Sequence, residues 1–210
     1  MDDYLTVEKY AAEEYIVNKS RFIGYCKPVS SADEAVEFIS EIRAKHRDAT
    51  HNVYAYCIRS PEYSRYSDDG EPQGTAGQPT LDAIKKNSLT DVCVVVTRYF
   101  GGILLGAGGL VRAYSHTASL AVNAACPVRM ALCDVFEINT DYSRFERVQK
   151  LILECGGIIE DTQYADSVRI SFRLHCADSA EMREKLTDMS NGSLRAEKTG
   201  EKYDICARKE

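Results

Sequence analysis

The sequence lacks several features that would assign a chain of 210 residues to a class at once. It has no tryptophan, no C-x-x-C pair among its eight cysteines, and no apolar run near the ~20 residues that a membrane span needs. Its acidic first residues, MDDYLTVEKY, have no apolar core and do not resemble a signal peptide. We therefore expect a cytoplasmic protein without a membrane partner or a zinc site, whose cysteines are reduced and mostly buried.

The sequence also lacks a basic excess. Its formal net charge is −6, and this charge divides evenly between residues 1–128 and 129–210. Non-specific binding to nucleic acids depends on a basic electrostatic field, so we do not expect nucleic acid to bind over the whole surface of the protein. A local basic patch is compatible with this net charge. A hydrophobic content of 44% in a chain of this length is enough for two small domains with separate cores.

The hydrophobic pattern changes at Pro127, which predicts a domain boundary there. Before it, the chain reads as strands, one helix, further strands, and then two helices around a central strand at 92–97. After it, residues 131–206 read strand, helix, strand, strand, helix, strand, the order of a ferredoxin-like unit. We therefore predict an α+β protein with domains at 1–128 and 129–210.

Individual elements have local signals. Residues 14–26 read as one strand, and Ser31 to Glu34 form a capping box that begins a helix. Residues 110–125 read as a long helix, preceded by a glycine-rich loop. Asp178 and Glu181 are expected to cap the last helix.

Glycine is concentrated in one part of the chain, because eight of the thirteen glycines lie between Gly70 and Gly109. A strand, a glycine loop and a helix N-terminus in that order suit an anion, since unpaired N–H groups and the helix dipole both face it. The spacing is neither that of a dinucleotide fold nor that of a P-loop. We predict a phosphate- or RNA-binding site formed by Arg98, Gly101, Gly102, Gly106, Gly108, Gly109 and Arg112. The alternative is that the glycines only allow close packing between strand and helix.

Residues 68–71 carry three carboxylates in four positions, Asp68, Asp69 and Glu71. Their spacing is irregular for a metal, so we predict a solvated acidic loop that pairs with Arg98 or Arg112. His51 begins a strand, where a packed or capping histidine is the commoner case. No G-x-S-x-G elbow is present, so we assign no catalytic residue, no metal and no cofactor.

Four motifs resemble the YigZ/IMPACT family: SRFIGY at 20–25, ATHNVYAY at 49–56, SDDGEPQGTAGQPTL at 67–81 and VVVTRYFGGILLGAGGLVRAYS at 94–115. The resemblance implies an N-terminal left-handed βαβ domain, similar to a small-subunit ribosomal protein domain and to domain four of elongation factor G. It also implies a C-terminal ferredoxin-like βαββαβ domain, as in the bacterial members. The polar residues that match the family are His51, Asp68, Asp69, Glu71, Thr75, Arg98 and Arg112.

Eukaryotic members of that family regulate translation, so the resemblance implies a link to translation. We expect a non-enzymatic regulator that docks on the ribosome, RNA or a translation factor through loops 66–80 and 98–112. Two alternatives stay open: a small enzyme that binds a phosphorylated metabolite or nucleotide at the glycine loop, and an interaction module in which this loop only maintains a turn.

Overall fold

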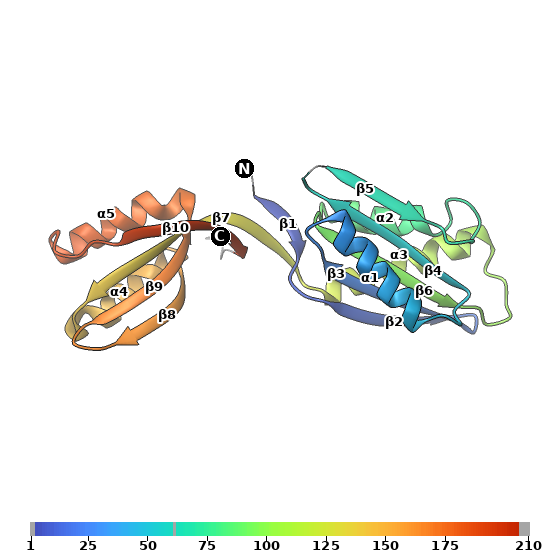
Figure 1. The fold of residues 1–210 in the computed structure, drawn as a ribbon, viewed down its shortest axis with the longest axis horizontal. Helices are drawn as coiled ribbons and strands as arrows, with labels where there is room; N and C mark the ends of the chain where they lie inside the picture. The colour runs from blue at the N-terminus through green and yellow to red at the C-terminus, as the bar shows by residue number, and fades with distance from the viewer. Residues whose placement is uncertain (1–2, 61, 206–210) are drawn as a thin grey trace. The chain divides into compact units, whose positions relative to one another are not determined.

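A computed structural model describes residues 3–60 and 62–205 of the chain, which form two units. One unit spans Tyr4–Val128, and the other consists of Asp3 with the chain from Arg129 onward. Each unit has its own β-sheet and its own helices (Figure 1). The predicted α+β class is therefore confirmed. Cys206, the end of the predicted last strand, lies outside the described residues, and five of the seven cysteines within them are buried, as expected.

The N-terminal unit has three layers. The unit begins with β1 (Tyr4–Val7). Its sheet has the strand order β2-β3-β6-β4-β5, and neighbouring strands run antiparallel. In this order the strands are β2 (Ala11–Val17), β3 (Ser20–Pro28), β6 (Val92–Tyr99), β4 (His51–Ile58) and β5 (Tyr63–Ser67). Helix α1 (Ala32–Lys45) covers one face, and α2 (Gly77–Lys86) and α3 (Gly106–Ala124) cover the other (Figure 1). Both β3 and β4 run antiparallel to β6, so β3, α1 and β4 form a βαβ unit with β6 between its strands.

Strand β6 explains why both faces of this sheet are covered. Its residues from Val92 to Arg98 are all buried, as expected for an interior strand that is apolar on both sides. Because side chains alternate along a strand, Val94 and Val96 join the core under α2 and α3. Cys93 and Val95 join the core under α1.

Helix α1 begins as its capping box predicts. The Ser31 hydroxyl accepts a hydrogen bond from the Glu34 backbone N–H at 3.2 Å, and the Glu34 carboxylate reaches back to the backbone N–H of Ser30. The prediction of one strand over 14–26 is wrong, because a turn separates β2 from β3. Asn18 and Lys19 form this turn in the left-handed region, with φ values of 45° and 62°, and no glycine marks it in the sequence.

The C-terminal unit has the predicted order of elements: β7 (Pro127–Thr140), α4 (Tyr142–Glu154), β8 (Ile158–Tyr164), β9 (Val168–His175), α5 (Ser179–Ser190) and β10 (Glu197–Ile205). Its strands lie in the order β10-β7-β9-β8, which is the ferredoxin-like arrangement. Val148 and Ile152 of α4 pack with Met182 and Leu186 of α5 against the same sheet core. Asp178 occupies the cap position of α5, but it makes no side-chain capping hydrogen bond there, contrary to prediction.

Within the described residues, no helix combines the length and the apolar character needed to cross a membrane.

Candidate functional site

Four polar side chains meet where the predicted acidic and glycine loops come together. His51 begins β4 and lies directly opposite Arg98 on the neighbouring strand β6. Glu71 comes from the loop between β5 and α2, and Tyr114 comes from α3. We call these four residues the polar cluster.

Glu71 is the centre of the polar cluster. Its Oε1 accepts hydrogen bonds from Arg98 Nη1 at 2.6 Å and from the Tyr114 hydroxyl at 2.8 Å. The side chains of Glu71 and Arg98 are only 3% and 6% exposed, so the ion pair is shielded from solvent. Burial also raises the pKa of Tyr114, which keeps its hydroxyl protonated as a donor.

The orientation of His51 is fixed by the backbone of the acidic loop. Its Nδ1 lies 2.7 Å from the carbonyl oxygen of Asp69. A carbonyl oxygen only accepts, so Nδ1 carries a proton. The Nε2 atom lies 3.8 Å from Glu71 Oε1. The two ring nitrogens of His51 therefore face the acidic loop and Glu71.

A cavity of about 390 Å³ opens beside the polar cluster. Its polar lining comes from the cluster and from Thr50, and its apolar walls come from both loops and from α3. The lining residues are Thr50, His51, Glu71, Pro72, Arg98, Phe100, Leu104, Leu105, Gly106, Ala107 and Leu110. An apolar cavity with a few convergent polar groups is the usual form of a small-ligand site.

The acidic loop is not solvated as predicted, because its carboxylates bind groups of the protein itself. Asp68 accepts from the backbone N–H groups of Gly74, Ala76 and Gly77, at the start of α2. Asp69 accepts from Arg43 and from the backbone N–H of Asn52, and Glu71 is buried. The described residues contain no group of three or more His, Cys, Asp or Glu that could hold a metal ion.

Glycine occupies the predicted positions for different physical reasons. A Cβ on Gly101 would lie 2.0 Å from the backbone carbon of Lys19, so this glycine permits close packing against the β2–β3 turn. Gly102 and Gly106 have φ values of +83° and +67°, which other residues rarely adopt. A Cβ on Gly108 would meet nothing within 4 Å, and one on Gly109 would lie 3.1 Å from Leu105 Cβ.

Helix α3 begins at Gly106 instead of Leu110, so three of the predicted loop glycines lie in its first turn. Its N-cap residue is Leu105, which makes no capping hydrogen bond through its side chain, and its first turn has no acidic residue. In the described part of the chain, neither the N-cap side chain nor an acidic residue of the first turn caps the N–H groups of this turn. Next to it, the loop exposes Phe100 and Ile103 by almost half and Leu104 by 86%.

Four of the twelve predicted residues line this cavity, namely His51, Glu71, Arg98 and Gly106, and the other eight, Arg112 and Thr75 among them, do not. Arg112 is exposed on α3, and its Nε donates to the carbonyl oxygen of Gly108 in the same helix at 3.1 Å. It therefore does not pair with the acidic loop. The Thr75 hydroxyl donates to the Pro72 carbonyl oxygen at 2.7 Å and stabilises the turn before α2.

Sequence reasoning did not predict the roles of Tyr114, Leu105 and Leu110 in the site. Leu110 and Tyr114 are four residues apart, so they share the face of α3 that packs toward the sheet. That spacing was a usable signal for a tyrosine buried between α3 and the sheet. Its acceptor, Glu71, is 43 residues away in the chain and cannot be read from local pattern.

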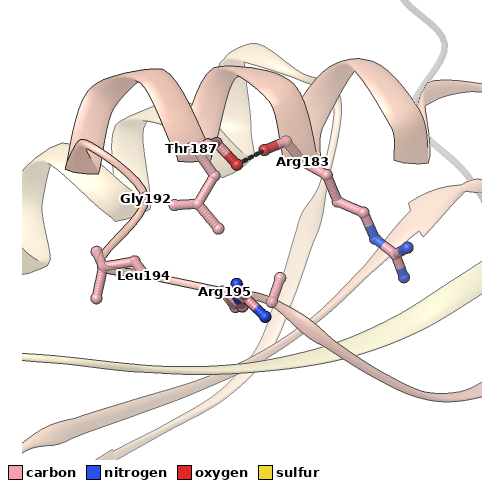
Figure 2. A pocket seen from close by; sticks show the side chains of 7 residues that line it. Arg183, Thr187, Gly192, Leu194 and Arg195 are labelled. Atoms are coloured by element: carbon pink, nitrogen blue, oxygen red, sulfur yellow. Dashed lines mark hydrogen bonds between the residues drawn. The ribbon is translucent and has the colours of Figure 1, made fainter.

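A second cavity, of about 410 Å³, lies in the C-terminal unit between α5 and the segment before β10 (Figure 2). Arg183 and Arg195 line it together with Leu186 and Leu194. The Thr187 hydroxyl is directed to the Arg183 carbonyl oxygen of its own helix, and the Arg183 side chain extends away from Thr187 (Figure 2). The lining of this cavity is more polar than that of the first cavity, which is almost entirely apolar.

Comparison with known proteins identifies the two units. Residues 18–122 match the Impact N-terminal domain, and residues 138–193 match a domain of unknown function, DUF1949. These matches define a two-domain protein with an Impact-type N-terminal domain.

Whole-chain relatives have the same organisation. The chain is 37% identical over 193 residues to the IMPACT family member YvyE of Bacillus subtilis, covering 91% of this chain and 89% of that protein. It is 35% identical over 181 residues to the IMPACT family member YigZ of Escherichia coli, covering 85% and 89%. A crystal structure titled as that of a hypothetical protein aligns with a TM-score of 0.60 and 32% identity, covering 95% of this chain and 98% of that one. The chain belongs to the IMPACT family.

Proposed function

We propose that this chain is a cytoplasmic, non-enzymatic regulator linked to translation. It docks on the ribosome, RNA or a translation factor through a docking surface formed by loops 66–80 and 98–112. Membership of the IMPACT family supports the link to translation, because the resemblance carried by the sequence motifs implies that eukaryotic members of this family regulate that process.

The exposed apolar side chains of the glycine loop carry the proposal. Phe100, Ile103 and Leu104 lie within five positions of one another and are 45%, 43% and 86% exposed. Single exposed apolar residues are ordinary, but a group of them beside a cavity and an open helix N-terminus is typical of a binding surface. Arg112 adds a cation on the same helix.

Co-sedimentation with ribosomes tests the docking surface, with Leu104→Asp as the disrupting variant. Ile16→Asp is the matched control, because Ile16 is 62% exposed on β2 and lies outside both loops. We expect the wild type and Ile16→Asp to sediment with ribosomes and Leu104→Asp to remain in the supernatant. Equal sedimentation of the two variants contradicts this placement of the surface.

The salt dependence of the same assay tests whether Arg112 contacts a phosphate. Each phosphate contact contributes about 0.9 to the slope of log affinity against log salt concentration for duplex nucleic acid, and about 0.7 for a single strand. We expect Arg112→Ala to weaken binding and to flatten the slope by about one contact. If neither the slope nor the affinity changes, Arg112 is not part of the docking surface.

A second candidate function is a small enzyme that acts on a phosphorylated metabolite or nucleotide. The cavity favours it, because His51 Nε2 and the Glu71 carboxylate lie beside the first turn of α3. A thermal-shift panel of nucleotides with and without magnesium tests this candidate. A ligand at a hundred times its Kd stabilises the protein by about 2.7 kcal/mol, so a panel without shifts counts against it.

A further inference from the structure

The cavity beside the polar cluster offers little to a polar ligand. Glu71 and Arg98 are bonded to each other at 2.6 Å, and their side chains are almost completely buried. The charges of the cluster therefore satisfy each other, and the surface that the cavity exposes is almost entirely apolar. A polar group that enters this cavity loses its contacts with water and gains few hydrogen-bond partners, which is unfavourable.

The cavity and the exposed part of the glycine loop form one apolar surface. Phe100 and Leu104 line the cavity, and they are also 45% and 86% exposed. Leu105 and Leu110 belong to the same lining. A cavity of about 390 Å³ with such walls has room for a large apolar side chain. Protein interfaces obtain much of their binding energy where one such anchor fills a pocket.

The charge that remains unpaired on the docking surface is positive. Loop 66–80 has three carboxylates, and each of them is bound by a group of the protein. Loop 98–112 contains no Asp or Glu, and within the described residues its exposed Arg112 pairs with no carboxylate. Gly106 and Ala107 line the cavity at the first turn of α3, where the helix dipole is positive. The surface is therefore complementary to an acidic partner.

We propose that the docking surface binds an acidic protein segment, which places one large apolar side chain in the cavity and a neighbouring carboxylate at the first turn of α3. The carboxylate accepts from N–H groups of that turn, as the side chain of an N-cap residue does and as Leu105 does not. A Cβ on Gly106 or Gly108 would meet nothing within 4 Å, so the carboxylate can approach the backbone there. This inference rests on the proposed function, because it names the class of partner that this surface recognises.

RNA fits the same surface less well. An unstacked base carries hydrogen-bonding atoms along its edges, and these atoms would face apolar walls in the cavity. Binding to the phosphate backbone depends on several cations. The two loops contain only two cationic residues, Arg98 and Arg112, and the first of them is buried in its ion pair. Among the partners of the proposed function, these observations favour a translation factor or a protein of the ribosome.

Two substitutions of Leu104 distinguish a protein partner from RNA in the ribosome sedimentation assay. Leu104 is 86% exposed, so we expect both variants to keep the wild-type stability. An apolar contact tolerates Leu104→Met but not Leu104→Lys, whereas a lysine added beside RNA phosphates strengthens binding. We expect Leu104→Met to sediment as the wild type does and Leu104→Lys to bind at least about tenfold more weakly. Equal or tighter binding of Leu104→Lys overturns the proposal in favour of RNA. Ile16→Lys is the matched control and is expected to bind as the wild type does.

Short synthetic peptides test the cavity without the ribosome. The probe has a phenylalanine between two aspartates, and it is compared with a peptide that has asparagine in place of phenylalanine and with one that has lysines in place of the aspartates. Nuclear magnetic resonance titration follows the backbone amide signals of Leu105 and Ala107. We expect the probe to bind at least about tenfold more tightly than the asparagine peptide, and more tightly than the lysine peptide. Equal affinities, or no change in these signals, overturn the proposal.

Ala107→Glu tests the place of the partner's carboxylate. A glutamate in the first turn of a helix is compatible with the fold, because it interacts favourably with the helix dipole. It also supplies the negative charge that the proposal assigns to the partner, so we expect this variant to lose the preference for aspartates over lysines in the peptide. Ala107→Gln has a similar shape without the charge and is expected to keep the preference. A preference retained by Ala107→Glu overturns the assignment of the carboxylate.

The outcomes separate this inference from the proposed function. If the peptides show no preference while Leu104→Asp and not Leu104→Lys abolishes ribosome sedimentation, the inference fails and the proposed function stands. If the peptide preference is found without any sedimentation, docking on the ribosome fails and the cavity keeps its assignment. Analytical ultracentrifugation tests a second copy of the chain as the occupant, and a dimer that dissociates in Leu104→Lys overturns the proposal.

Discussion

The acidic loop and the glycine loop border the same cavity but are held in opposite ways. The three carboxylates at 68–71 bind backbone N–H groups, Arg43 and Arg98 within the protein. The glycine loop carries no charge between Phe100 and Gly109, exposes its apolar side chains and ends in a helix start without a side-chain cap. In this protein the charged loop therefore stabilises the fold through bonds within the protein, and the uncharged loop provides the surface that is open to a partner.

The largest effect that tests this comparison is expected from Arg98→Ala. The variant leaves the Glu71 carboxylate buried without its cation, which destabilises proteins by about 3–5 kcal/mol. Urea denaturation measures this loss, and the exposed Arg112→Ala is the control, with an expected change within about 0.5 kcal/mol. Equal stabilities of the two variants would show that the acidic loop does not depend on its internal ion pair.

Gly101→Ala is expected to have the next largest effect. It tests the distinction between glycines that allow close packing and glycines that lie at the surface. Its Cβ would overlap the backbone at Lys19, so the β2–β3 turn or the glycine loop must move. Such overpacking corresponds to a loss of about 1–3 kcal/mol in the free energy of unfolding, measured by denaturation. A melting temperature equal to the wild type contradicts the close approach.

Asp68→Ala tests the acidic loop as support for α2. The side chain accepts from three backbone N–H groups, and loss of a helix-capping acceptor lowers stability by about 0.5–2 kcal/mol. Thermal unfolding measures the change. Asp33→Ala is the matched control, since Asp33 is exposed in the first turn of α1, where Ser31 already provides the cap. A larger loss from Asp33→Ala would contradict the supporting role of Asp68.

Gly108→Ala is expected to give the smallest effect and one of opposite sign. Its Cβ meets nothing within 4 Å and the residue lies in α3, so alanine should stabilise the protein by about 0.4–1 kcal/mol. Ribosome sedimentation by the same variant should weaken, since the methyl group occupies the surface on which a partner approaches. Destabilisation, measured by urea denaturation, would show that the fold itself requires glycine at position 108.

Local signals in the sequence predicted local structure well. The capping box at Ser31 defined the start of α1. The order of elements after Pro127 predicted the ferredoxin-like unit. The turn at Asn18 and the early start of α3 at Gly106 were missed, because neither carries its usual residue signal.

The state of the acidic loop could be predicted only in part. Pairing of this loop with Arg98 was one of the expected outcomes, and the structure contains the Glu71–Arg98 pair. The burial of that pair could not be predicted, because it depends on residues that are distant in the chain. Arg98 is 27 residues from Glu71, and Tyr114 is 43 residues from it. Only the assembled sheet and α3 bring them together.

The uniform apolar character of β6 also raises the question of how this strand finds its alignment with β4. A strand that is apolar on both faces can slip by one residue without exposing a polar side chain, so its hydrophobic pattern specifies pairing weakly. The polar residues at its end remove this ambiguity. Thr97 donates to Asn52 Oδ1 at 2.8 Å across the pair, and Arg98 reaches Glu71 only when it stands opposite His51. The polar side chains at this end of β6, Arg98 of the cavity among them, therefore also specify the native strand alignment.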